Sequence, residues 1–269
     1  MRPWRQSIEA GLVVREYGDP AGAPVVYVHG LGESGRCWLP LLAEPALAGL
    51  RHVVVDLPGY GRAAWPGAGE AQGLAEVAAH LARWWGDPRV MVVGHSMGGV
   101  IATLWAECAP AALAAVANLD GNLSLGDCTF SGQAAAVPAA QFDEAALAAM
   151  RGRVADRAGV GPGADAALRG YAASMAFADP AVLHRHAVDL VTMSTAEDLA
   201  ARLAALPVPS VYLAGTPGGC CARSRQLLDA AGARWTAIDG SGHWPMIDQP
   251  AATAAAVRAL AREAGLAGR

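Results

Sequence analysis

The chain has 269 residues, of which 54 % are hydrophobic and 16 % are charged, and its net charge is only −4. A chain of this length can bury a large core, either as one domain or as a core with an inserted segment. The small net charge argues against a nucleic-acid or polyanion partner.

The N-terminal segment, residues 1–7, lacks the apolar core of a secretory signal. No window farther along the chain approaches the length and hydropathy of a membrane span. We therefore expect a cytoplasmic protein with no membrane partner.

Short apolar runs alternate with longer segments of helical periodicity along most of the chain. Strands are predicted at residues 6–9 and 12–17, joined as a hairpin, and then at 24–28, 51–56, 90–93, 113–119, 209–214 and 234–238. Helices are predicted at residues 37–47, where Pro40 and Pro45 interrupt the pattern, and at 71–85, 97–108, 223–231 and 251–264. This alternation predicts an α/β fold, a parallel sheet with helices on both faces. Short right-handed crossovers then place the carboxyl ends of the strands along one edge, where ligands bind.

Residues 122–206 interrupt this alternation. Helices are predicted there at residues 144–158, 164–175 and 180–193, with a loop rich in glycine and proline at 159–163. Because the segment lies between two core strands, we expect a mostly helical cap over the functional edge of the sheet. Residues 1–121 and 207–269 then form the core. The alternative is an ordinary second domain that is remote from the chemistry.

The segment Gly94-His95-Ser96-Met97-Gly98 is a G-x-S-x-G turn between a predicted strand and a predicted helix. The chain must reverse from strand to helix within about one residue, and only residues without a Cβ let the backbone pass closely on either side of a strained serine. The Ser96 hydroxyl is thereby exposed above a helix N-terminus, whose free N–H groups and positive dipole end suit a developing oxyanion. Ser96 is the predicted nucleophile, and the alternative is an incidental serine in a glycine-rich turn.

Other side chains capable of acid–base chemistry also follow predicted strands. They are His29, Asp56, Asp120 and His243. Because the carboxyl ends of the strands share one edge, we expect these side chains on the same side of the sheet as Ser96. Such a gathering of reactive groups indicates an enzyme rather than a structural protein.

Four motifs of this chain resemble those of the α/β-hydrolase family, and together they span nearly its whole length. The resemblance implies an eight-stranded, mostly parallel sheet, a cap inserted after the sixth strand, and a catalytic triad in the chain order nucleophile, acid, histidine. Ser96 and His243 match the family pattern directly. The motifs are His29-Gly30-Leu31-Gly32, Asp56-Leu57-Pro58-Gly59-Tyr60-Gly61, Gly94-His95-Ser96-Met97-Gly98-Gly99 and Gly242-His243-Trp244-Pro245-Met246-Ile247-Asp248-Gln249-Pro250.

The resemblance does not assign the triad acid directly. The family usually places it after the seventh strand, but the loop in that place, residues 216–221, contains no carboxylate. A minority pattern places the acid after the sixth strand, where this chain has Asp120. Adjacent strands are only about 4.8 Å apart, so Asp120 can reach His243 from there. Asp120 is the predicted acid; the alternatives are Asp239, a weakened dyad without an acid, and an Asp120 that only forms a turn.

The resemblance also implies an oxyanion hole formed by the backbone N–H groups of Leu31 and Met97. In the family the residue corresponding to His29 supports the oxyanion loop. His95 is then expected to be a packed neighbour of the nucleophile, and Asp56 to anchor its own turn.

These features predict a serine hydrolase that cleaves an ester-like bond (ester, lactone or thioester) of a small, largely apolar substrate through an acyl-enzyme. A serine nucleophile argues against dehalogenase or epoxide hydrolase chemistry, since those relatives use aspartate. The alternatives are a carbon–carbon bond hydrolase, lyase or transferase on the same fold, or a catalytically silent ligand-binding protein. The candidate substrate-binding residues are Phe130, Met175, Phe177 and Trp244, although the first three fit the core of a cap equally well.

The cysteines are odd in number and scattered: Cys37, Cys108, Cys128, Cys220 and Cys221. They form neither a disulfide framework nor a metal-ligand spacing, so free thiols are predicted, with no metal and no cofactor. The only partner that the sequence predicts is a small-molecule substrate, and the sequence gives no indication of the oligomeric state.

Overall fold

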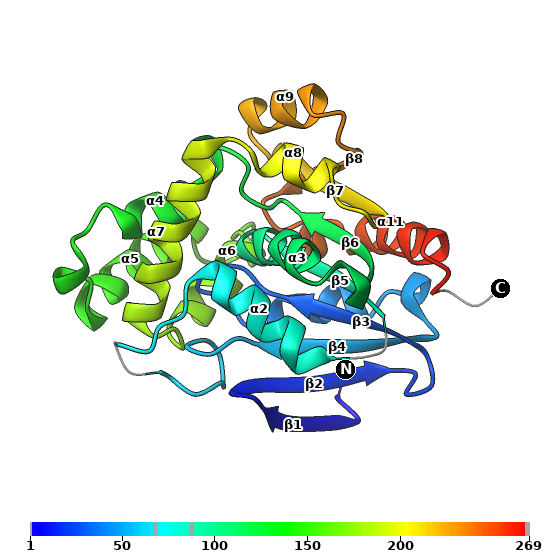
Figure 1. Cartoon of the computed structure of the whole chain (residues 1–269). Coiled ribbons are helices and arrows are strands. Elements are labelled where there is room, and N and C mark those ends of the chain that lie inside the picture. Colours follow the sequence, from blue (N-terminus) through cyan, green and yellow to red (C-terminus); the bar gives the residue numbers. More distant parts are fainter. Residues whose placement is uncertain (1, 67–68, 87–88, 267–269) are drawn as a thin grey trace.

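The computed structural model describes residues 2–66, 69–86 and 89–266, so the outermost residues of the predicted core, 1 and 267–269, lie outside the described part of the chain. Within it the strands form an eight-stranded sheet with the order β1-β2-β4-β3-β5-β6-β7-β8 (Figure 1). The strands are β1 (Arg5–Glu9), β2 (Leu12–Gly18), β3 (Ala23–Val28), β4 (Leu50–Asp56), β5 (Val90–His95), β6 (Leu113–Leu119), β7 (Ser210–Gly218) and β8 (Trp235–Gly242).

The first two strands are antiparallel and all the others are parallel. β1 pairs antiparallel with β2, and β2 with β4, whereas every pairing from β4 to β8 is parallel. The prediction of an eight-stranded, mostly parallel sheet is confirmed. The central strands β3 and β5 are rich in valines that are buried on both faces, such as Val26 and Val92, which lie opposite each other in the register.

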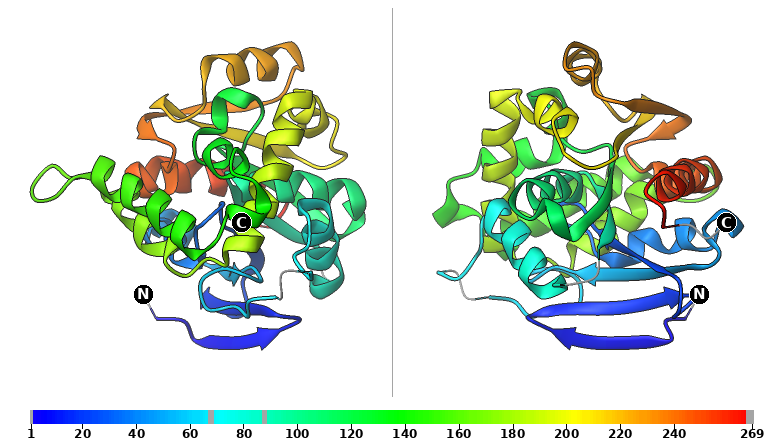
Figure 2. Two further views of the ribbon diagram at one scale, coloured as in Figure 1. Left: turned by 90° about the vertical axis from the view of Figure 1, so that its left-hand side faces the viewer. Right: turned by 45° about the vertical axis from the view of Figure 1, so that its right-hand side comes forward.

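Helices cover both faces of the sheet, as predicted. On one face α2 packs against α3, and on the other α1 packs against α11, which the right-hand view of Figure 2 shows on opposite sides of the strands. The α-helices are α1 (Leu39–Leu42), α2 (Leu74–Trp85), α3 (Met97–Cys108), α4 (Thr129–Ala135), α5 (Glu144–Ala158), α6 (Ala166–Met175), α7 (Pro180–Ala196), α8 (Leu199–Ala204), α9 (Ala222–Ala230), α10 (Pro245–Asp248) and α11 (Pro250–Glu263).

The predicted helix at 37–47 is wrong as a continuous element. The chain there forms a short 3-10 turn (Gly35–Trp38), the single-turn helix α1 and another 3-10 turn (Pro45–Leu47). The reason is that proline has no N–H to donate and begins helical turns more readily than it continues them, and Pro40 and Pro45 each stand at such a start.

Helix α2 illustrates how the pattern of the sequence becomes a packed element. Its buried residues, Leu74, Val77, Ala78 and Leu81, recur at the spacing that places them on one helical face. Helix α3 is buried on nearly every side instead, because it lies between the sheet and α2. This explains why its sequence is apolar throughout, including the turn that carries Ser96.

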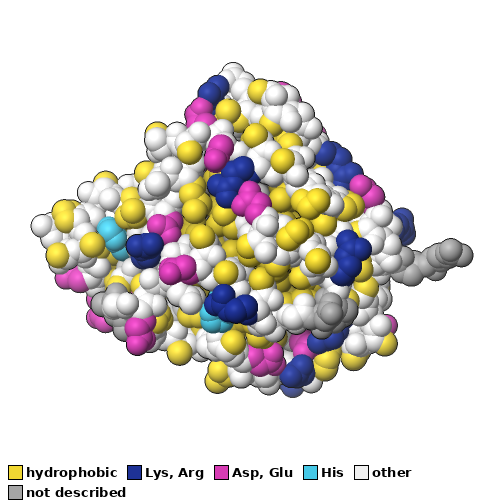
Figure 3. Space-filling model, viewed as in Figure 1, with side chains coloured by type: hydrophobic (Ala, Val, Ile, Leu, Met, Phe, Trp, Pro, Cys, Tyr) yellow, Lys and Arg dark blue, Asp and Glu magenta, His cyan; other side chains and the backbone are white. Residues whose placement is uncertain are grey.

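The segment between β6 and β7 forms helices α4 to α8. In it α4 packs against α7 and α5 against α6, and Figure 1 shows α4, α5 and α7 together at one side of the molecule, whereas α8 lies near β7. Among the described residues no helix is long and apolar enough to cross a membrane. The surface in Figure 3 carries charged side chains of both signs in small separate groups rather than one basic patch.

Candidate active site

The turn after β5 holds Ser96 in a conformation that few residues adopt. Its φ is +52° and its ψ is −119°, a strained combination that places the hydroxyl at the tip of the turn. The flanking glycines are sterically required. A Cβ on Gly94 would lie 2.0 Å from the carbonyl oxygen of Gly98, and one on Gly98 would lie 2.1 Å from that of Val28. The sharp strand-to-helix turn that the sequence indicates is therefore present, with Ser96 at the N-terminus of α3.

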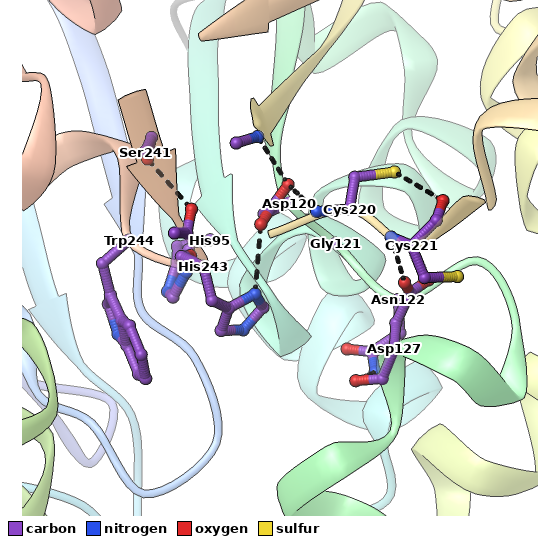
Figure 4. A network of polar contacts seen from close by, with 12 residues as sticks. His95, Asp120, Gly121, Asn122, Asp127, Cys220, Cys221, Ser241, His243 and Trp244 are labelled. Atoms are coloured by element: carbon purple, nitrogen blue, oxygen red, sulfur yellow. Dashed lines mark hydrogen bonds and ion pairs between the residues drawn. The ribbon is translucent and has the colours of Figure 1, made fainter. Parts of the chain in front are cut away.

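His243 and Asp120 come together beneath this edge of the sheet, as Figure 4 shows. The Nδ1 atom of His243 lies 3.2 Å from Oδ2 of Asp120. Asp120 follows β6 directly and its side chain is fully buried, whereas the His243 side chain is 21 % exposed. Ser96 and His243 line the same pocket. Among the described residues no hydrogen bond joins the Ser96 hydroxyl to the His243 ring, a contact that often tightens only when substrate is bound.

Residues 215–220, which comprise the end of β7 and the loop after it, contain no carboxylate and enclose Asp120 instead. The backbone N–H groups of Gly215 and Cys220 donate to Oδ1 of Asp120 over 2.9 and 3.1 Å. A Cβ on Gly219 would lie 2.0 Å from Oδ2 of Asp120, so only glycine allows the loop to close over the acid. Each oxygen of Asp120 therefore has a donor: the N–H groups of Gly215 and Cys220 donate to Oδ1, and His243 donates to Oδ2.

Burial raises the pKa of Asp120 above its ordinary value, and the hydrogen bond and charge of His243 together with the N–H of Gly215 act in the opposite direction. A positive charge that develops on His243 would therefore face a carboxylate that water does not reach. Asp239, the alternative acid, is exposed and accepts a hydrogen bond from Thr216. The geometry therefore places Asp120, and not Asp239, at His243.

Two backbone N–H groups on either side of Ser96, that of Leu31 in the loop after β3 and that of Met97 at the start of α3, have no hydrogen-bond acceptor among the described residues. Among the described residues neither the N–H of Leu31 nor that of Met97 makes a backbone hydrogen bond outside the regular elements, and Met97 is the first residue of α3, whose N–H has no partner within the helix. His29 stabilises this loop, because its Nδ1 contacts the Gly30 carbonyl at 2.8 Å and its Nε2 accepts from the Leu57 N–H. Asp56 accepts from the N–H of Arg62 within its own turn.

A buried carboxylate that sequence reasoning missed joins three segments of the site. The carboxylate of Glu33 accepts from the N–H of Gly30 over 2.7 Å, from Nδ1 of His95 over 2.9 Å and from the indole of Trp244 over 2.5 Å. The other ring nitrogen of His95 lies 2.7 Å from the carbonyl oxygen of His243. Because both nitrogens of His95 face acceptors, the ring must carry two protons and a positive charge.

The ion pair between Glu33 and His95 shifts the pKa values of both side chains. Burial opposes both charges, but the mutual attraction outweighs it. The charge and hydrogen bond of His95 hold the pKa of Glu33 at about 2, and Glu33 raises the pKa of His95 above 6.5. The pair therefore connects the loop after β3, the turn that carries Ser96 and the backbone of His243 by charged hydrogen bonds.

This pair predicts a specific dependence of stability on pH. The pKa of His95 is higher in the folded state than in the unfolded state, where it is 6.5. The stability that the charged His95 contributes to the fold is therefore complete below pH 6.5 and is lost as the pH rises through the pKa of the folded state. Between these two values the free energy of unfolding of the wild type, relative to that of His95→Gln, should fall by about 1.4 kcal/mol per pH unit. Denaturant unfolding at a series of pH values measures this difference, and parallel curves for the two proteins would contradict a charged His95.

The pocket at Ser96 is small, with a cavity volume of about 20 Å³, and receives residues from the core and from the segment 122–206. Two of the four predicted substrate-binding residues, Phe130 and Trp244, line it. Its lining residues are Leu31, Glu33, Ser96, Asn122, Asp127, Phe130, Ser131, Tyr171, Leu190, His243 and Trp244.

The other two predicted substrate-binding residues do not line this pocket. Met175 is fully buried. It lies next to Gly32, because a Cβ added to Gly32 would be 3.2 Å from Cγ of Met175. Phe177 is 60 % exposed and borders a different pocket behind Tyr171. Helix α6 ends at Met175, and the sequence does not show which face of this helix end turns toward the site. Tyr171, one turn earlier, is the residue of α6 that reaches the pocket.

All five cysteines are free thiols in the described structure, as predicted. Cys220 stands beside the acid, but it contributes its backbone N–H to Asp120 rather than its thiol. Among the described residues no group of three or more His, Cys, Asp or Glu side chains is placed to hold a metal ion.

Comparisons with known proteins agree with this architecture. The model of the alpha/beta hydrolase family matches residues 25–256. A thermophilic esterase from Thermogutta terrifontis superimposes with a TM-score of 0.73 at 20 % identity, covering 97 % of this chain and 99 % of that structure. At this level of identity the similarity establishes the fold.

Two curated relatives match shorter segments. Lipase LipV of Mycobacterium tuberculosis is 35 % identical over 114 residues, which cover 42 % of this chain and 43 % of the relative. The dihydrolipoyllysine-residue acetyltransferase component of the acetoin cleaving system of Pseudomonas putida is also 35 % identical over 114 residues, covering 42 % of this chain and 30 % of the relative. The chain thus spans less than half the length of these curated relatives.

Proposed function

Because the chain belongs to the α/β-hydrolase family, we propose that it is a serine hydrolase that cleaves an ester, lactone or thioester bond of a small substrate through an acyl-enzyme. The observation that carries the proposal is the placement of the strained Ser96 and the Asp120–His243 pair around one pocket. The naming of one relative as a lipase and of one structural neighbour as an esterase supports the same reading.

In this proposal His243 removes the proton of Ser96 as its oxygen attacks the carbonyl carbon of the substrate. The N–H groups of Leu31 and Met97 hold the negative oxygen, each contributing about 2.7–4 kcal/mol to the stability of the transition state. His243 then gives its proton to the leaving group, and water repeats the cycle on the acyl-enzyme. Asp120 keeps the imidazole oriented and stabilises its charged form.

We also propose that the segment 122–206 acts as a cap that limits the size of the substrate. Its residues Asn122, Phe130, Ser131, Tyr171 and Leu190 supply much of the wall of the pocket at Ser96. A remote second domain would not contribute to this wall. The core would then comprise residues 1–121 and 207–269.

A second candidate is acyl transfer to an acceptor other than water, and the similarity to an acetyltransferase component favours it specifically. Both candidates share the acyl-enzyme and differ only in what attacks it. Product analysis with and without added thiols or alcohols distinguishes them.

A fluorophosphonate probe tests the proposal that both candidates share. Ser96 should be labelled stoichiometrically, with loss of activity toward p-nitrophenyl esters, because the probe reacts with serines that a neighbouring histidine activates. Mass spectrometry of the digested protein identifies the labelled residue. An intact, folded protein whose Ser96 stays unlabelled would instead favour the silent ligand-binding protein.

A further inference from the structure

Two polar atoms in the wall of the pocket at Ser96 have no hydrogen-bond partner among the described residues. They are Oδ1 of Asn122 and the hydroxyl of Ser131. Both residues are almost fully buried, at 2 % and 3 % exposure, and both line the pocket. Asn122 follows β6 directly after the Asp120-Gly121 turn, and Ser131 lies in the first turn of α4.

The orientation of the Asn122 amide follows from its other contacts. Its Nδ2 donates to the carbonyl oxygen of Asp127 over 3.1 Å and approaches the sulfur of Cys128 at 3.6 Å. A carbonyl oxygen only accepts hydrogen bonds, so the nitrogen end of the amide belongs there and Oδ1 is the end without a partner.

The surrounding loop holds Asn122 in place. The carboxylate of Asp127 accepts from the N–H groups of Leu123 and Ser124 through one oxygen and from that of Cys221 through the other. The free acceptor is therefore a fixed part of the pocket wall rather than the end of a mobile side chain.

A buried polar atom without a partner costs about 1–3 kcal/mol of stability, so its position calls for a reason. Two of the unpartnered atoms belong to residues that line one pocket, and Ser96 lines the same pocket. The remaining ones among the described residues, on Trp38, His80, Trp105 and Ser194, do not line it. The neighbouring wall residues Phe130 and Leu190 are apolar.

We propose that Asn122 and Ser131 form a polar subsite that binds a hydroxyl group of the substrate. A hydroxyl can donate to Oδ1 of Asn122 and accept from the hydroxyl of Ser131 at once, whereas an amide N–H can satisfy only the first. Because the pocket is small, this hydroxyl lies within a few bonds of the carbonyl that Ser96 attacks. The inference rests on the proposed function and narrows it to hydroxylated esters.

The test compares pairs of esters in which a methyl group replaces the hydroxyl at nearly equal volume. p-Nitrophenyl 3-hydroxybutanoate is paired with the 3-methylbutanoate, the 2-hydroxybutanoate with the 2-methylbutanoate, and 2-hydroxyethyl butanoate with propyl butanoate. One neutral hydrogen bond changes an equilibrium by roughly 2- to 12-fold, so kcat/KM should favour the hydroxylated member of at least one pair by about tenfold or more. Equal values within every pair would overturn the proposal.

Ser131→Ala should reduce that preference by about 3- to 10-fold while changing kcat/KM for the methyl member little, because it removes one of the two hydrogen bonds. Ser194→Ala is the matched control, since it removes another buried hydroxyl that lacks a partner but lies outside the pocket. Asn122→Ala should abolish the preference, but it also removes the contacts of Nδ2, so its thermal unfolding is measured alongside. A Ser131→Ala enzyme with the full wild-type preference would contradict the subsite.

A binding measurement tests the subsite even if the proposed hydrolysis is wrong. If Ser96 is unlabelled and no ester is hydrolysed, isothermal titration of the Ser96→Ala protein with both members of each pair still reports the preference of the pocket. Tighter binding of a hydroxylated ester, weakened by Ser131→Ala, would support the subsite even then. Equal binding of both members would reject it.

Discussion

Replacing Ser96 by alanine is expected to lower kcat for ester hydrolysis by about 10⁶-fold, because the acyl-enzyme cannot form without the nucleophile. The fold should be retained. Ser96 makes no side-chain capping hydrogen bond to α3, so alanine removes little that stabilises the turn. The strained backbone at Ser96 is imposed by the strand, the helix and the two glycines, and it remains when the hydroxyl is lost.

Steady-state kinetics with p-nitrophenyl butanoate and a thermal unfolding curve together provide the measurement. Ser194→Ala, which alters a buried serine outside the pocket, should keep the wild-type kcat. Near wild-type hydrolysis by Ser96→Ala would show that another group is the nucleophile.

The sheet and the strand-to-helix turn at Ser96 could be predicted because their signals are local. A run of β-branched residues, a glycine on each side of the serine and an apolar helix are adjacent in the sequence, and each constrains the same few ångströms of backbone. The parallel sheet followed from the alternation of elements, and its eight strands from the resemblance to a known family. Local signals did not predict residues 37–47 correctly, because two prolines divide an otherwise helical pattern into separate short turns.

The Glu33 network could not be predicted, because its contacts connect residues that are distant in the chain. Glu33 is separated from His95 by 62 residues and from Trp244 by 211. Only the pairing of β3 with β5 brings the first two together. The one available signal was a carboxylate within an apolar loop that follows a buried strand, and such a residue fits a solvated turn equally well.

The pocket wall was predicted only in part for a related reason. Phe130 and Trp244 reach the pocket, whereas Met175 and Phe177 do not. Which side chains of a helix face a site depends on how the helix is rotated against the core, and the apolar faces of α6 fit several rotations. Asn122 and Ser131 carry no periodic signal, and their missing partners become apparent only when every buried polar atom is accounted for.

The second large effect on kcat is expected from replacing Asp120, the carboxylate that we propose as the triad acid. Asp120→Asn should lower kcat by about 10⁴-fold, the loss that the same change causes in a well-studied serine protease. Two backbone N–H groups donate to Oδ1 of Asp120, so the asparagine oxygen will stay on that side. Its NH₂ group then faces Nδ1 of His243, which must accept instead of donate. The other ring nitrogen keeps its proton and cannot take the proton of Ser96.

Asp239→Asn is the matched control for this prediction. Asp239 is exposed and bonded to Thr216, so its variant should retain kcat within about twofold, as surface changes of no more than about 0.5 kcal/mol allow. The loss in Asp120→Asn should also be smaller than that in Ser96→Ala, because the nucleophile and the oxyanion hole survive it. In one protease the removal of the acid costs about 3 × 10⁴-fold in kcat, against about 2 × 10⁶-fold for the nucleophile. If Asp239→Asn were the damaging change and Asp120→Asn the silent one, the close contact between Asp120 and His243 would serve only to hold the loop after β7.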